Sequence, residues 1–324
     1  GERTGNADLC SIVPSLGLHV GSKMTCLDNL PNMTSVSRFV DETLNRQPVS
    51  SAPFVGASAF AHKGGLHVAA MERSPLSYQH VDPAKVGNEK RILISELSGR
   101  QNIMGKIKEV GVDVDGDDDV SARATAILNR VKQLESFGYT FEGAEASVDL
   151  MILHGNENYC PPFKVLDYSA MVFDSNLDSA SRVLDANSDA TPHENSESTT
   201  ARATIKVRTI NMDEASDDPY VDRLEVSDGN GPVDALAMAL KRSLLTNHPH
   251  IKDLELVDYK VRILDPESAT SAATRVMIEF KDHSSGELWT TVSVDRNVIS
   301  ASLNALVDGF EYALVDHGCL LHDM

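Results

Sequence analysis

The sequence predicts an α+β protein, in which a mostly helical first half is followed by a second half that contains two βββα repeats. Three observations support this class. Apolar residues recur at three-to-four spacing in the first half, which is typical of helices. Shorter segments with strand-like apolar patterns follow in the second half, and the strand and helix patterns there occur twice. At 324 residues the chain has room for roughly two or three domains.

The first half opens with a loop that leads into helices. An apolar run begins at residues 6–9, and residues 35–44 place apolar side chains at helical spacing. A Ser/Pro-rich linker follows at residues 48–53. Beyond the linker we expect a helical stretch over residues 86–110, broken at Ser98-Gly99-Arg100, and a further helix over residues 120–137.

An acidic turn precedes that last helix. Residues 113–119 combine five aspartates with Gly116, a composition that resembles a calcium-binding loop. The EF-hand pattern requires Gly at its sixth position and Glu at its twelfth, whereas here Gly116 is fourth and Ala124 is twelfth. We therefore interpret the turn as a solvated loop that caps the next helix.

The second half contains an internal repeat. Residues 165–174 match residues 256–265 at an offset of 91 (256 − 165), and both predict strands. Residues 228–240 match residues 295–307 at an offset of 67 (295 − 228), and both predict capped amphipathic helices. The offsets differ by 24 (91 − 67), so the first copy carries an insertion, and the polar segment 178–200 is expected to be this mobile loop.

Each copy has room for two more strands between its first strand and its helix. These lie at residues 204–209 and 223–226 in the first copy and at residues 274–280 and 288–294 in the second. A duplicated unit of this kind either packs only into a stable core or also holds a ligand or a second subunit. The repeat alone favours neither.

Composition excludes several classes of partner. The 29 Lys and Arg residues against 48 Asp and Glu residues give a net charge of −19, which disfavours nucleic acid and anionic membranes as partners. No stretch approaches the ~18–20 apolar residues of a membrane helix. The four cysteines form no CxxC pair and therefore indicate reduced thiols rather than a disulfide framework or zinc site. We expect a soluble protein in a reducing compartment.

The segment Phe60-Ala-His-Lys-Gly-Gly-Leu-His67, followed by Tyr78, has the residue types of a proton-transfer site. Imidazole titrates nearer to neutral pH than any other side chain, and paired glycines allow the backbone to turn tightly. The alternative interpretation is that His62 and His67 flank an ordinary turn.

Several motifs together resemble the family of acyl-CoA-condensing synthases that make citramalate and 2-isopropylmalate. These motifs are Gly1-Glu-Arg-Thr-Gly-Asn6, Phe60-Ala-His-Lys-Gly-Gly-Leu-His67, Tyr78-Gln-His-Val-Asp-Pro83, Arg91-Ile-Leu-Ile-Ser-Glu-Leu-Ser-Gly-Arg100 and Phe141-Glu-Gly-Ala-Glu-Ala-Ser147. The resemblance runs essentially end to end. Residues 60–102 and 258–265 are more similar to the citramalate branch than to the 2-isopropylmalate branch.

The resemblance implies three parts and an acyltransferase activity. Residues 1–17 would end a catalytic (β/α)8 barrel, residues 18–154 would form a helical linker region that contributes to the active site, and residues 155–324 would form a regulatory, dimerising domain. The implied reaction joins acetyl-CoA to a 2-oxo acid, which is pyruvate for citramalate and 3-methyl-2-oxobutanoate for 2-isopropylmalate. With most of the barrel absent, we expect this chain alone to be inactive. A stand-alone amino-acid-binding module is the alternative, and the compartment would be the cytoplasm or a plastid.

The resemblance also implies roles for single residues. His67 would transfer a proton and Tyr78 would donate a hydrogen bond near the thioester, both in the barrel of a neighbouring subunit of a homodimer. Asn6 would be a ligand of a divalent metal (Mg, Mn or Zn) that is held mainly by barrel residues, although by itself Asn6 also suits a helix N-cap. His62 and His80 would be structural or would orient the site.

Two arginines and one turn complete the expected set. Arg91 and Arg100 would either meet CoA phosphates or form ion pairs. In the regulatory domain the resemblance implies a branched-chain amino acid effector, isoleucine or leucine. Residues expected near the effector are Asp228, Gly229, Asn230, Gly231, Ala269, Thr270, Ala272 and Ala273. Plain helix capping and turn chemistry explain the same residues, and the turns Asp228–Pro232 and Asp295–Asn297 are expected to cap the two helices.

Overall fold

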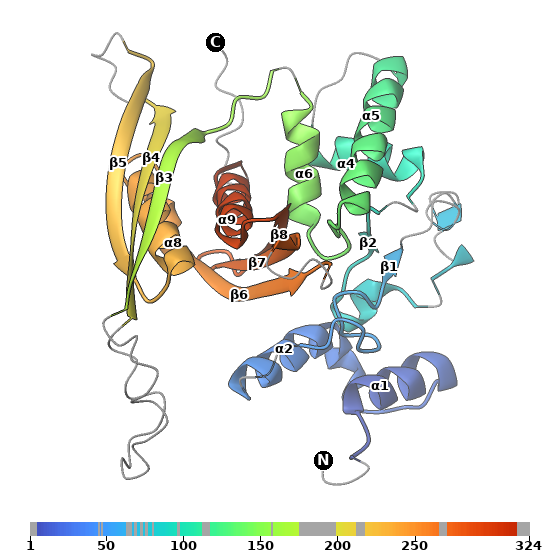
Figure 1. Cartoon of the computed structure of the whole chain (residues 1–324). Coiled ribbons are helices and arrows are strands. Elements are labelled where there is room, and N and C mark those ends of the chain that lie inside the picture. The colour runs from blue at the N-terminus through green and yellow to red at the C-terminus, as the bar shows by residue number, and fades with distance from the viewer. Residues whose placement is uncertain are drawn as a thin grey trace, which may run out of the picture. The chain divides into compact units, whose positions relative to one another are not determined.

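The computed structural model describes residues 5–44, 46, 48–62, 67, 70–71, 74, 77–79, 81–95, 98–111, 117–156, 158–174, 199–211, 218–265 and 271–315. The chain divides into two compact units, Gly1–Lys132 and Gln133–Met324. The mixed α+β class is confirmed (Figure 1). Most of the expected insertion lies outside the described residues, as do His80, Ala269, Thr270 and the paired glycines after His62.

The first unit is built from short helices and one small parallel sheet. In chain order its elements are α1 (Leu9–Pro14), the π-helix η1 (Ser15–Val20), the 3-10 helix η2 (Leu27–Asn32), α2 (Met33–Thr43), β1 (Ala61–His62), η4 (Pro83–Val86), β2 (Arg91–Ile92), α4 (Arg100–Val110) and most of α5 (Asp117–Ser136). The helices expected at residues 35–44 and 120–137 are therefore present as α2 and α5. Among the described helices, none is long and apolar enough to cross a membrane.

The helix expected over residues 86–110 is wrong in its first part. Gly87 ends η4 with a φ of +69°, a left-handed conformation that glycine tolerates. The chain then runs alongside β1, because the Arg91 amide donates to the Phe60 carbonyl (3.2 Å). Of the described part of the expected helical stretch, only the residues from Arg100 to Val110 form an α-helix, α4.

A small apolar core holds the first unit together. Leu30, Phe60, Val81 and Val86 are buried in it. The Thr34 hydroxyl donates to the Val86 carbonyl (2.8 Å) and adds a buried hydrogen bond to this core. Phe60 and Val81 therefore anchor both ends of the segment that carries His67 and Tyr78.

The second unit contains two three-stranded antiparallel sheets, each followed by a helix (Figure 1). Its elements are α6 (Glu145–His154), β3 (Phe163–Asp174), β4 (Thr199–Ile210), β5 (Tyr220–Gly229), α8 (Pro232–Leu245), the 3-10 helix η6 (Pro249–Asp253), β6 (Leu254–Ile263), β7 (Thr274–Asp282), β8 (Leu288–Asp295) and α9 (Val298–Leu314). The sheet orders are β3-β4-β5 and β6-β7-β8. The first strand of each sheet shifts register at one place, between Val165 and Asp167 and between Leu256 and Asp258.

The two helices pack on the sheets and share one core. Figure 1 shows α8 against the sheet of β3, β4 and β5, and α9 beside β7 and β8. On β7 every second residue from Thr274 to Asp282 is buried, as expected for a strand with one covered face. Phe280 stacks on Trp289 and meets Phe310 edge to face, with ring centroids 5.9 Å apart in both pairs. These aromatic rings fill the core below α9.

The short helix α6 packs against β8 and α9. Most of its side chains are buried, which suits a helix that is covered on nearly all sides. The Ser147 hydroxyl accepts a hydrogen bond from the Val292 amide of β8 (2.9 Å). The helix is thus an integral part of the second unit.

The helix caps differ from two of the three expected. Asp8, not Asn6, caps α1, because its carboxylate accepts from the Cys10 amide (3.0 Å). Asp228 does not cap α8, which begins after Gly231 without a side-chain cap. The strand register places Asp228 opposite Arg202, and this guanidinium binds its carboxylate (2.7 Å). Asn297 caps α9 as expected, through the Ile299 amide (2.9 Å).

Candidate functional site

Two candidate catalytic side chains, separated by ten residues in sequence, are stacked on each other. The rings of His67 and Tyr78 have centroids 4.3 Å apart and an angle of 27° between their planes. Both side chains are exposed, Tyr78 by 50%. An imidazole and a phenol, an acid–base group and a hydrogen-bond donor, therefore face the same open surface. This arrangement suits proton transfer on a ligand that is supplied from outside the unit.

The pair is positioned by the elements on either side of it. β1 and β2 form a short parallel ladder, in which the Leu93 amide donates to the His62 carbonyl (3.0 Å). Asn88 fastens the preceding loop, because its amide nitrogen donates to the carbonyls of Phe54 and Gly56 (2.9 Å each). These hydrogen bonds to backbone carbonyls hold the start of the segment in place. His67, which follows this start, is left exposed.

His62 lies within electrostatic range of His67. Burial lowers the pKa of the His62 imidazole, and the charges of Lys90 and His67 lower it further. Its Nε2 atom is buried and has no hydrogen-bond partner in the part of the chain that the structure describes. His62 is therefore a neutral imidazole beside the exposed pair.

The two arginines are placed differently. Arg91 forms an ion pair with Glu89, with 3.0 Å between Nη2 and Oε1, which is the second of the two expectations for this residue. Arg100 is exposed at the start of α4. The exposed position of the Arg100 guanidinium suits both expected partners, a CoA phosphate or an acidic side chain.

Asn6 is exposed between Gly5, with a φ of +86°, and the first turn of α1. Its carboxamide oxygen is a hard donor of the kind that Mg²⁺ and Mn²⁺ accept. Among the described residues, no group of three or more His, Cys, Asp or Glu side chains is placed to hold a metal ion. The residues therefore fit a metal only if most ligands come from elsewhere.

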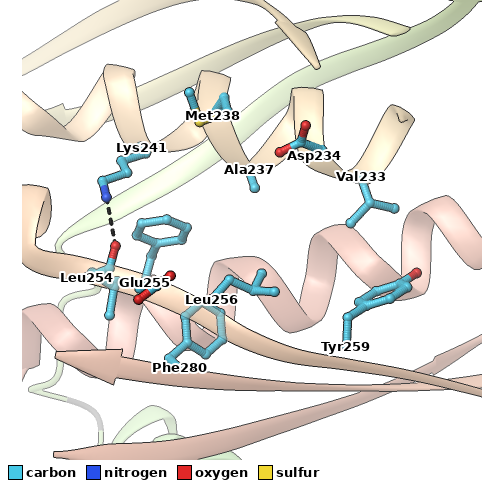
Figure 2. A pocket seen from close by; sticks show the side chains of 11 residues that line it. Val233, Asp234, Ala237, Met238, Lys241, Leu254, Glu255, Leu256, Tyr259 and Phe280 are labelled. Atoms are coloured by element: carbon cyan, nitrogen blue, oxygen red, sulfur yellow. Dashed lines mark hydrogen bonds between the residues drawn. The ribbon is translucent and has the colours of Figure 1, made fainter. Parts of the chain in front are cut away.

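The second unit contains a cavity of about 480 Å³ between α8 and the strands β6 and β7. Figure 2 shows apolar side chains around its middle and polar groups toward its ends. It is lined by Val233, Asp234, Ala237, Met238, Lys241, Leu254, Glu255, Leu256, Tyr259, Phe280 and Phe310. Its lining suits a small molecule with an apolar body.

The polar groups of this cavity are held by neighbours. Lys241 donates from Nζ to the Leu254 carbonyl (2.7 Å), the bond drawn in Figure 2. Burial lowers the pKa of the Lys241 ammonium, while the charges of Asp253 and Glu255 act against this shift. The Tyr259 hydroxyl is 2.8 Å from the Ser302 hydroxyl.

None of the described residues that were expected near an effector belongs to the lining of this cavity. The turn Asp228–Gly231 leads into α8, and the Asn230 amide donates to the carboxylate of Asp234, which does line the cavity (2.9 Å). Gly229 is required there, because a Cβ would lie 2.5 Å from the Ala235 nitrogen. Ala272 and Ala273 precede β7 and are not among the lining residues. Tyr259, which does line the cavity, lies in the repeated strand segment 256–265, which the sequence predicted as a strand and not as part of a site.

Two family models match separate parts of the chain. Residues 167–314 match the LeuA allosteric (dimerisation) domain. Residues 54–137 match the homocitrate synthase post-HMGL domain-like family. The first range covers both three-stranded sheets with their helices, and the second covers the segment that carries His67 and Tyr78.

Curated relatives match the chain almost from end to end. It is 42% identical over 315 residues to the (R)-citramalate synthase of Synechocystis sp., covering 97% of this chain and 52% of the relative. It is 38% identical over 317 residues to the (R)-citramalate synthase of Aquifex aeolicus, covering 97% of this chain and 54% of the relative. The 2-isopropylmalate synthase of Methanocaldococcus jannaschii is 24% identical over 316 residues, covering 97% and 52%. The chain therefore spans about half the length of these relatives.

Proposed function

We propose, from the premise that this chain belongs to the family of (R)-citramalate and 2-isopropylmalate synthases, that it is the C-terminal half of an acyltransferase that makes (R)-citramalate from acetyl-CoA and pyruvate. The stacked pair of His67 and Tyr78 carries this proposal. The citramalate branch is favoured because the relatives named for it reach 42% identity, whereas the 2-isopropylmalate synthase reaches 24%.

The reaction needs a base for the acetyl methyl group and donors for the developing oxyanion. His67 takes or returns the proton, since its imidazole is exposed and imidazole is a common acid–base group. The Tyr78 hydroxyl donates a hydrogen bond to the thioester or to the water that hydrolyses it. A divalent metal would polarise the keto group of the 2-oxo acid, and Asn6 would be its ligand from this chain.

The rest of the active site would come from the remaining half of the longer protein. Residues 1–17 would end its barrel, residues 18–154 would be the linker region and residues 155–324 the regulatory domain. Apolar side chains on the first helices support this division, because Leu9, Val20 and Phe39 are 69%, 69% and 67% exposed. Large apolar groups at such exposure favour a covering surface. In a homodimer the barrel of the second subunit would receive His67 and Tyr78.

The cavity beside α8 would bind the feedback effector of isoleucine biosynthesis. Its apolar lining suits a branched aliphatic side chain, and the amides of the nearby turn Asp228–Gly231 suit a carboxylate. The two strand-and-helix units would be copies of one βββα repeat, as the matching register shifts suggest. Isoleucine is the expected ligand, and a preference for leucine in a calorimetric titration would favour the 2-isopropylmalate branch.

The catalytic proposal is tested in the full-length enzyme by the variants His67→Ala and Tyr78→Phe. Removal of a positioned acid–base group lowers kcat by about 100-fold or more. His283→Ala and Tyr220→Phe, at exposed positions of the second unit, are the matched controls and should keep wild-type kcat. Free thiol release from acetyl-CoA and pyruvate is the assay, and the present chain alone should release none.

Wild-type turnover in His67→Ala would reject the catalytic role of this residue. Turnover by the present chain alone would reject the assignment of its parts. If the full-length protein shows no synthase activity but binds isoleucine, the chain is a stand-alone regulatory module instead.

A further inference from the structure

A cluster of four titratable side chains joins the end of α6 to the end of α9. The His154 Nε2 atom lies 2.5 Å from Oε1 of Glu311. The Tyr159 hydroxyl donates to the same oxygen (2.7 Å), and its ring lies 5.3 Å from the imidazole. Asp308, one turn before Glu311 on α9, completes the cluster and acts on both His154 and Glu311. No residue of this cluster belongs to the proposed catalytic pair or to the cavity lining.

The Glu311 carboxylate is unusual because its side chain is only 4% exposed. A buried carboxylate is costly unless hydrogen bonds and an opposite charge offset the lost hydration. Two partners of its Oε1 atom lie more than 150 positions away in the sequence, His154 at 157 and Tyr159 at 152. The charge is therefore stabilised only while α6 and the segment after it stay in place.

The protonation state of the cluster acts on the same contact. The hydrogen bond to Glu311 raises the pKa of the His154 imidazole, opposed by burial and supported by the charges of Glu311 and Asp308. Burial raises the pKa of the Asp308 carboxyl to about 7, and the charge of Glu311 adds to this while that of His154 opposes it. α6 carries one further buried acid, Asp149. The described contact that β8 makes with α6 comes from the Val292 backbone amide.

Both pKa shifts are upward, so the folded cluster holds more protons than the unfolded chain near neutral pH. The contribution of His154 to stability is therefore complete below the ordinary histidine value and is lost as the pH rises through its raised pKa. The contribution of Asp308 is complete below the ordinary aspartate value of 3.8 and is lost as the pH rises through about 7. At higher pH the imidazole is neutral, and Asp308 becomes a second negative charge beside Glu311. Deprotonation thus weakens the attachment of α6 in two ways, because it removes the positive charge of His154 and adds the negative charge of Asp308.

We propose that His154, Tyr159, Asp308 and Glu311 form a proton-sensitive clasp that fastens α6 to α9 and loosens as the pH rises. α6 lies between the two ranges that match family models, residues 54–137 and 167–314. The clasp therefore sets how firmly the connecting helix is held to the allosteric domain. This inference does not depend on which reaction the longer protein performs.

The test is hydrogen exchange of the α6 amides in the present chain, expressed as protection factors between about pH 6 and about pH 8.5, together with NMR titration of His154. In the wild type we expect the protection factors of the α6 amides to fall across this range. Each pKa unit by which pairing raises the His154 pKa should lower them by about tenfold. In Glu311→Gln the pH dependence should become weaker, because only burial still raises the pKa of Asp308, and His154 should titrate at lower pH.

The matched control is His283→Gln, which removes the imidazole that pairs with Glu255 at an exposed site on the second unit. It should leave the protection of α6 and its pH dependence unchanged. His154→Gln, at a half-exposed position, provides the same test if Glu311→Gln does not fold. Protection that is flat with pH in the wild type overturns the proposal, as does a pH dependence that persists unchanged in Glu311→Gln or, where that variant fails to fold, in His154→Gln.

Discussion

Gly309 lies in the middle of α9 at a point where the helix touches the aromatic core. A Cβ atom at this position would lie 2.0 Å from Cε2, 2.2 Å from Cζ and 2.7 Å from Cδ2 of Phe280. Helix propensity alone predicts that Gly309→Ala stabilises the protein by about 0.5–1 kcal/mol. The contact with Phe280 predicts the opposite, so the substitution separates the two effects.

The magnitude follows from how little room the ring has. An ordinary contact begins at 3.4 Å, so the ring would have to move by about 1.4 Å (3.4 − 2.0). Phe280 is 1% exposed and lies between Trp289 and Phe310, which block such a movement. Overpacking of this kind costs typically about 1–3 kcal/mol, which exceeds the gain in propensity. We expect a net loss of stability of about 1–2 kcal/mol in the second unit.

Urea denaturation followed by tryptophan fluorescence measures this loss directly, because Trp289 is the single tryptophan of the chain and stacks on Phe280. Gly105→Ala in α4 is the matched control, since no atom lies within 4 Å of the added Cβ. Circular dichroism should show the first unit stabilised in Gly105→Ala by the ordinary propensity gain. A Gly309→Ala protein that is as stable as the wild type or more stable would show that the core is loose around Phe280.

Two further predictions concern a turn and a surface charge. Gly87→Ala should destabilise the first unit by more than about 1 kcal/mol, because its φ of +69° is unfavourable for alanine and its Cβ would lie 2.0 Å from the Pro31 carbonyl oxygen. Thermal denaturation checks this against Gly111→Ala, which has a similar φ of +77° but open space, and an equal loss in both would contradict the clash. Asp222 has a pKa of about 2 rather than 3.8, because Arg208 and Lys206 hydrogen-bond its carboxylate. Its contribution to stability is therefore present above pH 3.8 and is lost as the pH falls toward 2. Asp222→Asn should have a flatter acid limb in urea midpoints, and an unchanged slope would show that this pairing contributes nothing.

Periodicity predicted the middle strand of each sheet, because burial alternates along β4 and β7. Ala201, Ala203, Ile205 and Val207 are all completely buried on one face of β4, and such alternation is visible in the sequence. The expected strand at residues 204–209 was nevertheless too short, since β4 begins at Thr199. Hydrogen bonding with β3 extends the strand over polar residues that carry no apolar signal.

Pairing between distant segments explains the misread region before α4. Residues 91–92 lie beside β1, which is 30 positions earlier in the ladder between Ala61 and Arg91. No local pattern in a single sequence records such a partner. The same limit applies to the cap of α8, where Arg202 takes the carboxylate of Asp228.

The two candidate sites differ in how far a sequence can predict them. His67 and Tyr78 are close in the chain and lie beside a glycine pair, so their residue types already indicated a site. The cavity is formed by α8, β6, β7 and α9, and each contributes ordinary core residues such as Leu256 and Phe310. Its existence depends on how these elements pack, which a pattern of residue types does not specify. The clasp around Glu311 could not be predicted from the sequence for the same reason.

The position of α6 along β8 also limits how this protein can associate with itself. β8 is the last strand of its sheet, and an uncovered edge offers amides and carbonyls to strands of other molecules. The Ser147 hydroxyl occupies the Val292 amide, and the helix packs along this strand. A shortened protein that starts at Gly155 would lack this cover. Its β8 edge would be open to strand addition, so such a fragment would aggregate where the longer chain does not.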